Sequence, residues 1–190
     1  MHFSAHVLFF PTLALCMPQL FNRPTAESVI ESVVNIHNAV VEADSTLQAY
    51  TGGFTPTTIV DDAKVLGGFA KIHSANREGF RRATFAAQFS VEETVEFINT
   101  VIATVNISIP LATQHIREKK QVFKENGLRS SVVAALALLL YDHDTFSAAA
   151  AKNFNPGTPR EKLNQGIDAA GNIHNVIQSA LLYYSLGLKL

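Results

Sequence analysis

The spacing of the apolar residues between positions 29 and 50 most constrains how this chain can fold. These residues recur at alternating intervals of four and three, which is the repeat of one face of an α-helix. A half-buried strand would require alternation at every second residue, and the chain shows no such pattern. The sequence therefore predicts a long amphipathic helix, whose apolar stripe comprises Val29, Val33, Ile36, Val40, Ala43, Leu47 and Tyr50.

The same spacing predicts four further helices. Ser90 to Glu93 and Thr158 to Glu161 have the pattern of capping boxes, and Gly127 is a typical residue just beyond a helix end. Because short loops favour antiparallel neighbours, we predict an all-α fold, a five-helix antiparallel bundle, in a single domain over residues 25–190. The predicted helices span residues 26–50, 57–85, 90–126, 129–152 and 159–186.

The predicted third helix is unusually long and contains a proline. Its apolar stripe keeps one phase from Val91 to Ile116, and a helix that stopped at Pro110 and restarted would lose that phase. Pro110 has no N–H to donate to the carbonyl of Asn106. We therefore expect one continuous helix with a kink at Pro110.

An apolar block of ten residues, Val132 to Tyr141, lies inside the predicted fourth helix. A bilayer-spanning helix needs about 20 such residues. Arg129 precedes the block and Asp142 follows it, so the block predicts a buried helix and no transmembrane segment. Because most of its circumference is apolar, we expect this helix to lie at the centre of the bundle.

The overall composition excludes one class of partner. Charged residues make up 16% of the chain, the net charge is −1, and no basic run occurs. Soluble proteins average about 25% charged residues. Nucleic-acid binding requires a basic footprint, so we expect no nucleic-acid partner.

The N-terminal residues indicate a secreted protein. Residues 1–20 contain an apolar segment, Val7 to Cys16, that is typical of a signal peptide. No Lys or Arg precedes it, which leaves open a disordered or docked apolar arm. Removal of this segment would remove the only cysteine, Cys16, so the mature extracellular domain would contain no disulfide.

The sequence contains no recognisable catalytic motif. A nucleophile elbow, a zinc-protease motif and a glycine-rich phosphate loop are all missing. Asp142, His143 and Asp144 resemble a ligand cluster, but consecutive helical residues point about 100° apart and cannot converge. We therefore predict a non-enzymatic protein with no catalytic residue, no metal site and no cofactor.

Four features allow two interpretations each. Gly67 and Gly68 mark either a close helix crossing or room for a ligand. Lys119 and Lys120 either extend to solvent at a helix end or bind a carboxylate at the mouth of an apolar cavity. Phe80, Phe85 and Phe89 either cap the core or form an exposed tip that contacts a surface. The sequon at Asn106 is a glycosylation candidate on the flank of its helix, although a mid-helix position disfavours modification.

Residues 117–154 resemble the fungal hydrophobic surface binding protein A family, also described as cell-wall galactomannoproteins. The similarity lies in the pattern from Lys119 to Gly127 and in the pattern from Leu136 to Ala148, within "LALLLYDHDTFSA". It extends over most of the chain after about residue 25, but only residues 117–150 are distinctive. The resemblance implies a secreted helical bundle that binds hydrophobic surfaces or lipids, in some relatives a fatty acid between the helices. It also implies a secreted hydrolase as a partner and association with the cell wall.

Two functional hypotheses remain. In the first, the protein binds a long-chain lipid in an apolar cavity or adsorbs to a hydrophobic surface. In the second, it is a structural mannoprotein of the cell wall or a host-interaction protein with a filled core. For the first hypothesis, the expected ligand-lining residues are Leu66, Phe69, Ile98, Ile102, Phe123, Leu136, Leu139, Leu140, Phe146, Ile173, Ile177 and Tyr184.

Overall fold

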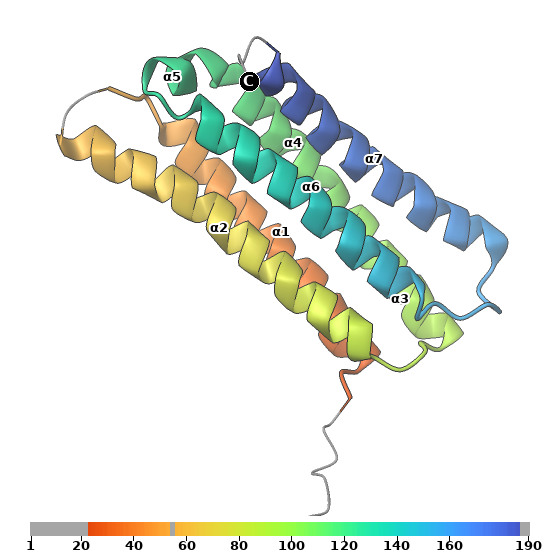
Figure 1. Cartoon of the computed structure of the whole chain (residues 1–190). Coiled ribbons are helices and arrows are strands. Elements are labelled where there is room, and N and C mark those ends of the chain that lie inside the picture. The colour runs from red at the N-terminus through yellow and green to blue at the C-terminus, as the bar shows by residue number, and fades with distance from the viewer. Residues whose placement is uncertain (1–22, 54–55, 187–190) are drawn as a thin grey trace, which may run out of the picture.

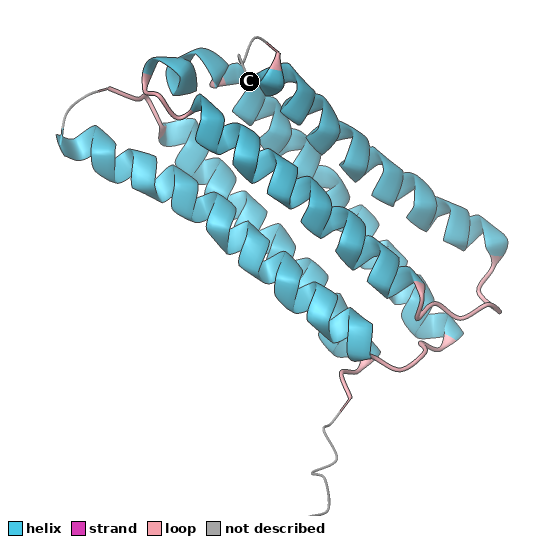
Figure 2. Ribbon diagram, viewed as in Figure 1, coloured by secondary structure: helices cyan, strands magenta, loops and turns pink. Residues whose placement is uncertain are grey.

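A computed structural model describes residues 23–53 and 56–186 of the chain, and the predicted signal peptide lies outside these residues. The described part is helical, with no strand (Figure 2). If α3 and α4 are counted as one bent helix, this part has six helices rather than the five predicted. The segments are α1 (Ala26–Ala49), α2 (Pro56–Phe85), α3 (Val91–Ala103), α4 (Val105–Glu118), α5 (Lys120–Glu125), α6 (Arg129–Ala151) and α7 (Arg160–Ser185).

The long helices form a ring around a central axis (Figure 1). Around this ring α1 packs on α2, α2 on α6, α6 on α7, α7 on α3 and α4, and these two on α1. The short α5 lies at one end, between α4 and α6. Because each long helix packs mainly on its two ring neighbours, no helix occupies the centre.

Only two of the five ring interfaces join antiparallel helices. The α1–α2 and α6–α7 pairs are antiparallel, as the contacts of Arg82 with Glu31 and of Arg129 with the Tyr184 carbonyl require. The helices run parallel in three pairs, α1–α4, α2–α6 and α4–α7. In each pair, the residue numbers of the hydrogen-bonded partners increase together along the two helices. Chain-consecutive long helices do alternate in direction, but α2 lies across the ring from α3, and α4 from α6. The prediction of antiparallel neighbours is therefore wrong for three interfaces.

The predicted third helix is bent, but the bend is not where proline suggested. The helical backbone breaks at Thr104, where φ is −123° and ψ is −88°, whereas Pro110 lies inside α4. Thr100 and Thr104 each donate a hydroxyl hydrogen bond to the carbonyl four residues earlier, at 2.9 and 2.6 Å. Such side-chain bonds favour a bend, and the break at Thr104 lies two residues before Asn106, whose carbonyl Pro110 leaves without its usual donor. A second break, at Lys119, separates α4 from α5.

The apolar helix α6 lies in the ring and not at the centre, contrary to the prediction. It packs between α2 and α7, and its outer face exposes Leu138 and Tyr141, which are 42% and 60% accessible. Apolarity on all sides therefore does not mean burial on all sides here.

Of the two predicted capping boxes, one is present in the structure and the other is not. The capping box at Ser90 is confirmed, because its hydroxyl accepts from the Glu93 backbone N–H while the Glu93 carboxylate accepts from the Ser90 N–H. The second box is wrong: α7 has no side-chain cap, and the buried hydroxyl of Thr158 has no hydrogen-bond partner.

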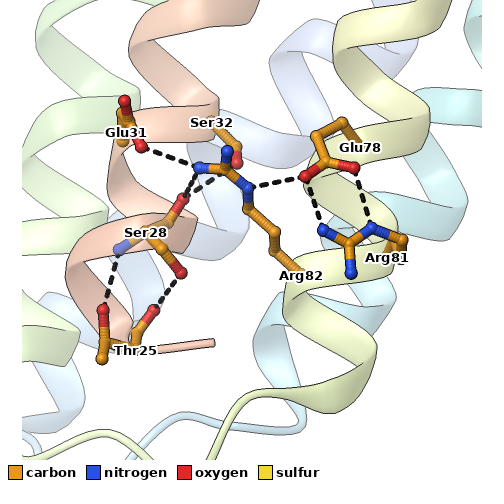
Figure 3. Close-up of polar contacts among 7 residues, drawn as sticks. All are labelled: Thr25, Ser28, Glu31, Ser32, Glu78, Arg81 and Arg82. Atoms are coloured by element: carbon orange, nitrogen blue, oxygen red, sulfur yellow. Dashed lines mark hydrogen bonds and ion pairs between the residues drawn. The ribbon is translucent and has the colours of Figure 1, made fainter. Parts of the chain in front are cut away.

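A cluster of charged side chains fixes the start of α1 to the end of α2 (Figure 3). The Arg82 guanidinium donates to the Ser28 carbonyl at 2.9 Å, to Glu31 at 2.8 Å and to Glu78 at 2.9 Å. Arg81 donates two further bonds to Glu78. These donors hold the pKa of Glu78 far below its usual value, at about 2.

Candidate functional site

The centre of the ring contains a cavity of about 170 Å³. Side chains from all five ring positions line it, so the cavity follows directly from the absence of a central helix. The lining residues are Val33, Ile36, Val40, Phe69, Ile72, Asn76, Phe97, Ile98, Val101, Val105, Ile109, Ala112, Thr113, Ile116, Leu136, Leu139, His143, Phe146, Ser147, Ala151, Phe154, Gly166, Ile167, Ala170, Ile173 and Ile177.

The cavity wall carries no Asp, Glu, Lys or Arg side chain. Its polar side chains are few, and most make local hydrogen bonds. His143 donates from Nε2 to the Ala170 carbonyl at 3.1 Å, and Asn76 donates to the Ile72 carbonyl. Burial lowers the pKa of His143, so its ring is neutral at neutral pH. The wall is thus chemically suited to a hydrocarbon and unsuited to an unpaired charge.

The cavity is long and narrow. On α6 its lining runs from Leu136 to Ala151, and on α7 from Gly166 to Ile177, which at 1.5 Å per residue correspond to roughly 22 and 16 Å. The acyl chains of one bilayer leaflet span about 15 Å. Length therefore matches a long acyl chain. The volume is close to that of an engineered cavity of about 150 Å³ that holds benzene, so the helices must move apart to admit such a chain.

One end of the cavity reaches the surface between α6 and α7. Ile167 of α7 lines the cavity although it is 68% accessible, and Ala151 of α6, which also lines it, is exposed. The facing half of α7 carries small residues, Gly166 and Ala170, at the same wall.

Seven of the twelve residues expected to line a ligand site do line this cavity: Phe69, Ile98, Leu136, Leu139, Phe146, Ile173 and Ile177. Five do not. Leu66, Ile102 and Leu140 pack against the core outside the cavity wall. Phe123 and Tyr184 are fully buried at the α5 end, where Phe123 stacks on Tyr50 with ring centres 5.3 Å apart. Ligand contact at the seven positions stays a prediction.

The prediction missed the part of the wall that α1 and α4 contribute. Val33, Ile36 and Val40 of α1 face the cavity, as do Val105 and Ile109 of α4. All five belong to apolar stripes that are visible in the sequence. The stripe shows which residues point inward, but it does not show which of them meet empty space.

The structure shows what surrounds the two lysines, Lys119 and Lys120, and the second of the two glycines, Gly68. The Lys119 ammonium donates to the carbonyls of Gln48 and Tyr50 at 3.0 and 2.7 Å, and Lys120 donates to the Tyr183 carbonyl. Both lysines therefore lie against the ends of neighbouring helices. Gly68 marks a close helix crossing, because a Cβ there would lie 2.9 Å from the Ala43 side chain.

The three phenylalanines expected to form one surface tip are separated in the structure. Phe85 is 61% accessible, Phe80 is partly buried beneath the Arg77 guanidinium, and Phe89 is 2% accessible. Phe89 packs against Phe154, with ring centres 6.3 Å apart. The prediction of a common exposed tip is wrong, because the loop after α2 directs Phe89 into the core.

Each histidine of the described residues bridges two helices. The resulting pairs are His37–Ser108, His73–Asp142, His115–Asp44, His143–Ala170 and His174–Asp144. Within the 142–144 cluster, Asp142 contacts α2, whereas His143 and Asp144 contact two different residues of α7, so the three side chains do not converge on one point. No group of three potential metal ligands occurs within residues 23–53 and 56–186.

Asn106 lies on the α4–α7 interface and accepts a hydrogen bond from Asn172 at 2.7 Å. It is partly exposed, while Ser108 of the same sequon is buried and bonded to His37. Glycosylation at Asn106 stays a prediction.

Two stretches, Val91–Glu118 and Arg129–Ala151, are long and apolar enough to cross a membrane by length and composition alone. The cores of water-soluble bundles contain helices of the same kind, and both stretches pack within the ring. The expected absence of a transmembrane segment stays a prediction.

The ring and its cavity define a class of protein, the all-helical bundle with an internal apolar cavity. Solved structures share this fold. The ligand binding domain 1 of Penicillium marneffei MP1 protein, complexed with arachidonic acids, has a TM-score of 0.74 at 20% identity, and the match covers 85% of this chain and 99% of that domain. AFMP4P in complex with palmitic acid has a TM-score of 0.75 at 15% identity, with coverage of 84% and 99%. Domain 2 of the MP1 protein has a TM-score of 0.71 at 17% identity, with coverage of 82% and 93%.

The sequence profile of the family described as hydrophobic surface binding protein A matches residues 26–152. The chain belongs to this family, which confirms the resemblance seen in the sequence. Comparison with curated proteins gives no significant match.

Proposed function

We propose that the protein is a secreted, non-enzymatic binding protein that holds a long-chain fatty acid in the central cavity. The observation that carries the proposal is a charge-free cavity, long enough for an acyl chain, in the middle of the ring. The domains of similar fold solved with arachidonic and palmitic acids support the choice of ligand.

The expected affinity follows from the apolar area that a ligand would bury. Each buried methylene contributes about 0.8 kcal/mol, so the fourteen methylenes of palmitic acid give a gross gain of about 11 kcal/mol. Association, ligand ordering and the widening of the ring oppose this by several kcal/mol. The net result is a dissociation constant that is micromolar or somewhat weaker.

The test is a binding titration with delipidated protein. We expect saturable binding of palmitic or arachidonic acid at tens of micromolar, and a lipid in organic extracts of the protein purified from its natural source. Absence of saturable binding for every long-chain acid would refute the proposal. N-terminal sequencing of protein from the culture medium tests secretion, since a mature chain should begin after about residue 20.

A second candidate function is adsorption to a hydrophobic solid. The outer faces of α1 and α4 expose Val34, Val41, Ile107 and Leu111, and no charged residue lies between Phe97 and Gln114. We call these four residues the α1–α4 apolar face. The hydrogen bond between His37 and Ser108 shows that α1 and α4 lie side by side. Replacing Ile107 and Leu111 with Ser should release the protein from hydrophobic beads, whereas Phe85→Ser should not.

A further inference from the structure

A fatty acid in the central cavity would have to place its charged end elsewhere. No Lys or Arg lines the cavity, and the one histidine in its wall is buried with its Nε2 already bonded to a carbonyl. A carboxylate without a partner in such surroundings is strongly disfavoured. The headgroup must therefore reach a polar site at one end of the cavity.

A polar groove lies on the outside of the α4–α7 interface, and Thr113 belongs to the walls of both the groove and the cavity. The other groove residues come from the second half of α4 and the second half of α7. They include Gln114, Arg117, Glu118, Ser179 and Tyr183. The linings of the apolar cavity and of the groove therefore meet at Thr113.

Arg117 is the cation of this groove, and it is held in place without a carboxylate. Its guanidinium lies over the Tyr183 ring, 4.9 Å from the centre, and Nη1 is 3.3 Å from the Ser179 hydroxyl. Among the described residues no carboxylate lies within 4.0 Å of it. The neighbouring Glu118 instead accepts from Gln114 at 3.0 Å. Most donors of this guanidinium therefore remain free for an anion.

The opposite end of the cavity is less suitable for an anion. Ile167 forms the exposed edge there, and the exposed Asp168 follows it directly. Lys162, near the start of α7, already donates to two side-chain amide oxygens, at 2.8 and 2.6 Å. Along α7 the ten residues between Ile167 and Ile177 span about 15 Å, the length of the acyl chains in one leaflet. A ligand with its carboxylate in the groove would thus extend its methyl end toward Ile167.

We propose that the groove at Arg117 is the carboxylate subsite of the protein. The acyl chain passes Thr113, between α4 and α7, into the cavity, and the headgroup stays outside as the partner of the Arg117 guanidinium and the Ser179 hydroxyl. This inference rests on the proposed function. It adds a site and an orientation to it.

The test compares a fluorescent fatty acid, cis-parinaric acid, with its methyl ester, which has the same chain and no charge. The wild-type protein should bind the acid more tightly than the ester. Arg117→Gln should weaken binding of the acid by about tenfold and leave binding of the ester unchanged. Arg160→Gln, at the exposed start of α7, is the matched control and should change neither.

Unchanged binding of the acid by Arg117→Gln would overturn the carboxylate subsite, as would an equal loss of acid and ester. Failure of the wild-type protein to bind either probe would instead refute the proposed function. The path past Thr113 is tested separately by Thr113→Phe, which should abolish binding of both probes while circular dichroism shows unchanged helix content. Gln121→Phe, at an exposed position of α5 outside both the groove and the cavity wall, is the control and should keep the affinity for both probes. If Thr113→Phe retains both probes, the path is wrong.

Discussion

A bulky side chain placed in the cavity should weaken ligand binding while changing the stability of the fold only slightly. We choose Leu139→Trp as the test of this prediction. Leu139 lines the cavity, whereas Leu140 packs against the core outside the cavity wall, so Leu140→Trp is a matched control one residue away. The chain has no tryptophan of its own. Each variant therefore carries a single fluorophore that reports on its own surroundings.

The magnitude follows from the cavity volume. At about 24 cal/mol per Å³, an empty cavity of about 170 Å³ reduces the free energy of unfolding by about 4 kcal/mol. If the indole fills roughly a third of this space, about 1 kcal/mol returns, and strain from overpacking opposes it by about 1–3 kcal/mol. We therefore expect the unfolding free energy of Leu139→Trp to stay within about 2 kcal/mol of wild type.

Binding should respond much more strongly than stability. With the lumen obstructed, the affinity of Leu139→Trp for palmitic acid should fall by at least about tenfold, which corresponds to 1.4 kcal/mol. Leu140→Trp should bind as the wild type does, and the ligand should shift the fluorescence only where the indole lies near it. Urea denaturation followed by circular dichroism measures stability, and calorimetric titration measures affinity. Equal affinities of the two tryptophan variants would refute the assignment of the cavity as the binding site.

Three further predictions concern stability. Hydrogen bonds from Arg81 and Arg82 lower the pKa of Glu78 from 4.5 to about 2. The stability that these bonds contribute is therefore complete above pH 4.5 and is lost as the pH falls toward 2. Glu78→Gln should show a smaller acid-induced drop in the urea denaturation midpoint than the wild type. Burial lowers the pKa of His143, so the unfolded chain binds the proton first and stability should fall below about pH 6.5, less steeply in His143→Gln. Phe123→Ala should cost about 3–5 kcal/mol in chemical denaturation yet leave the affinity for fatty acid unchanged, since Phe123 is fully buried but lies outside the cavity wall.

The helices were predictable because their signals are local. The stripe from Val29 to Tyr50 and the capping box at Ser90 each involve residues within a few turns, and both correspond to observed elements. The bend at Thr104 was not predictable from Pro110, because it depends on which hydroxyl groups bond back to the helix.

The arrangement of the ring was less accessible to sequence reasoning. A stripe indicates which side chains point inward, but it does not show which helix lies opposite. The apolar α6 was therefore placed at the centre, although Leu138 and Tyr141 face solvent. For the same reason the sequence does not distinguish Phe69 and Leu139, which line the cavity, from Leu66 and Leu140 on the same helices, which do not. Inward-pointing side chains either pack against one another or leave a cavity, depending on the spacing between the five helices. The pattern of a single segment does not determine that spacing.

The parallel α1, α4 and α7 impose an electrostatic asymmetry on the bundle. Three helix C-termini lie at the α5 end, together with the N-termini of only α2 and α6. Each helix terminus carries roughly half an elementary charge, so this end has an uncompensated negative potential of about one terminus. Lys119, Lys120 and Arg129 donate to the terminal carbonyls there and neutralise it. The helix directions themselves therefore favour positive charge at this end, whatever ligand the cavity holds.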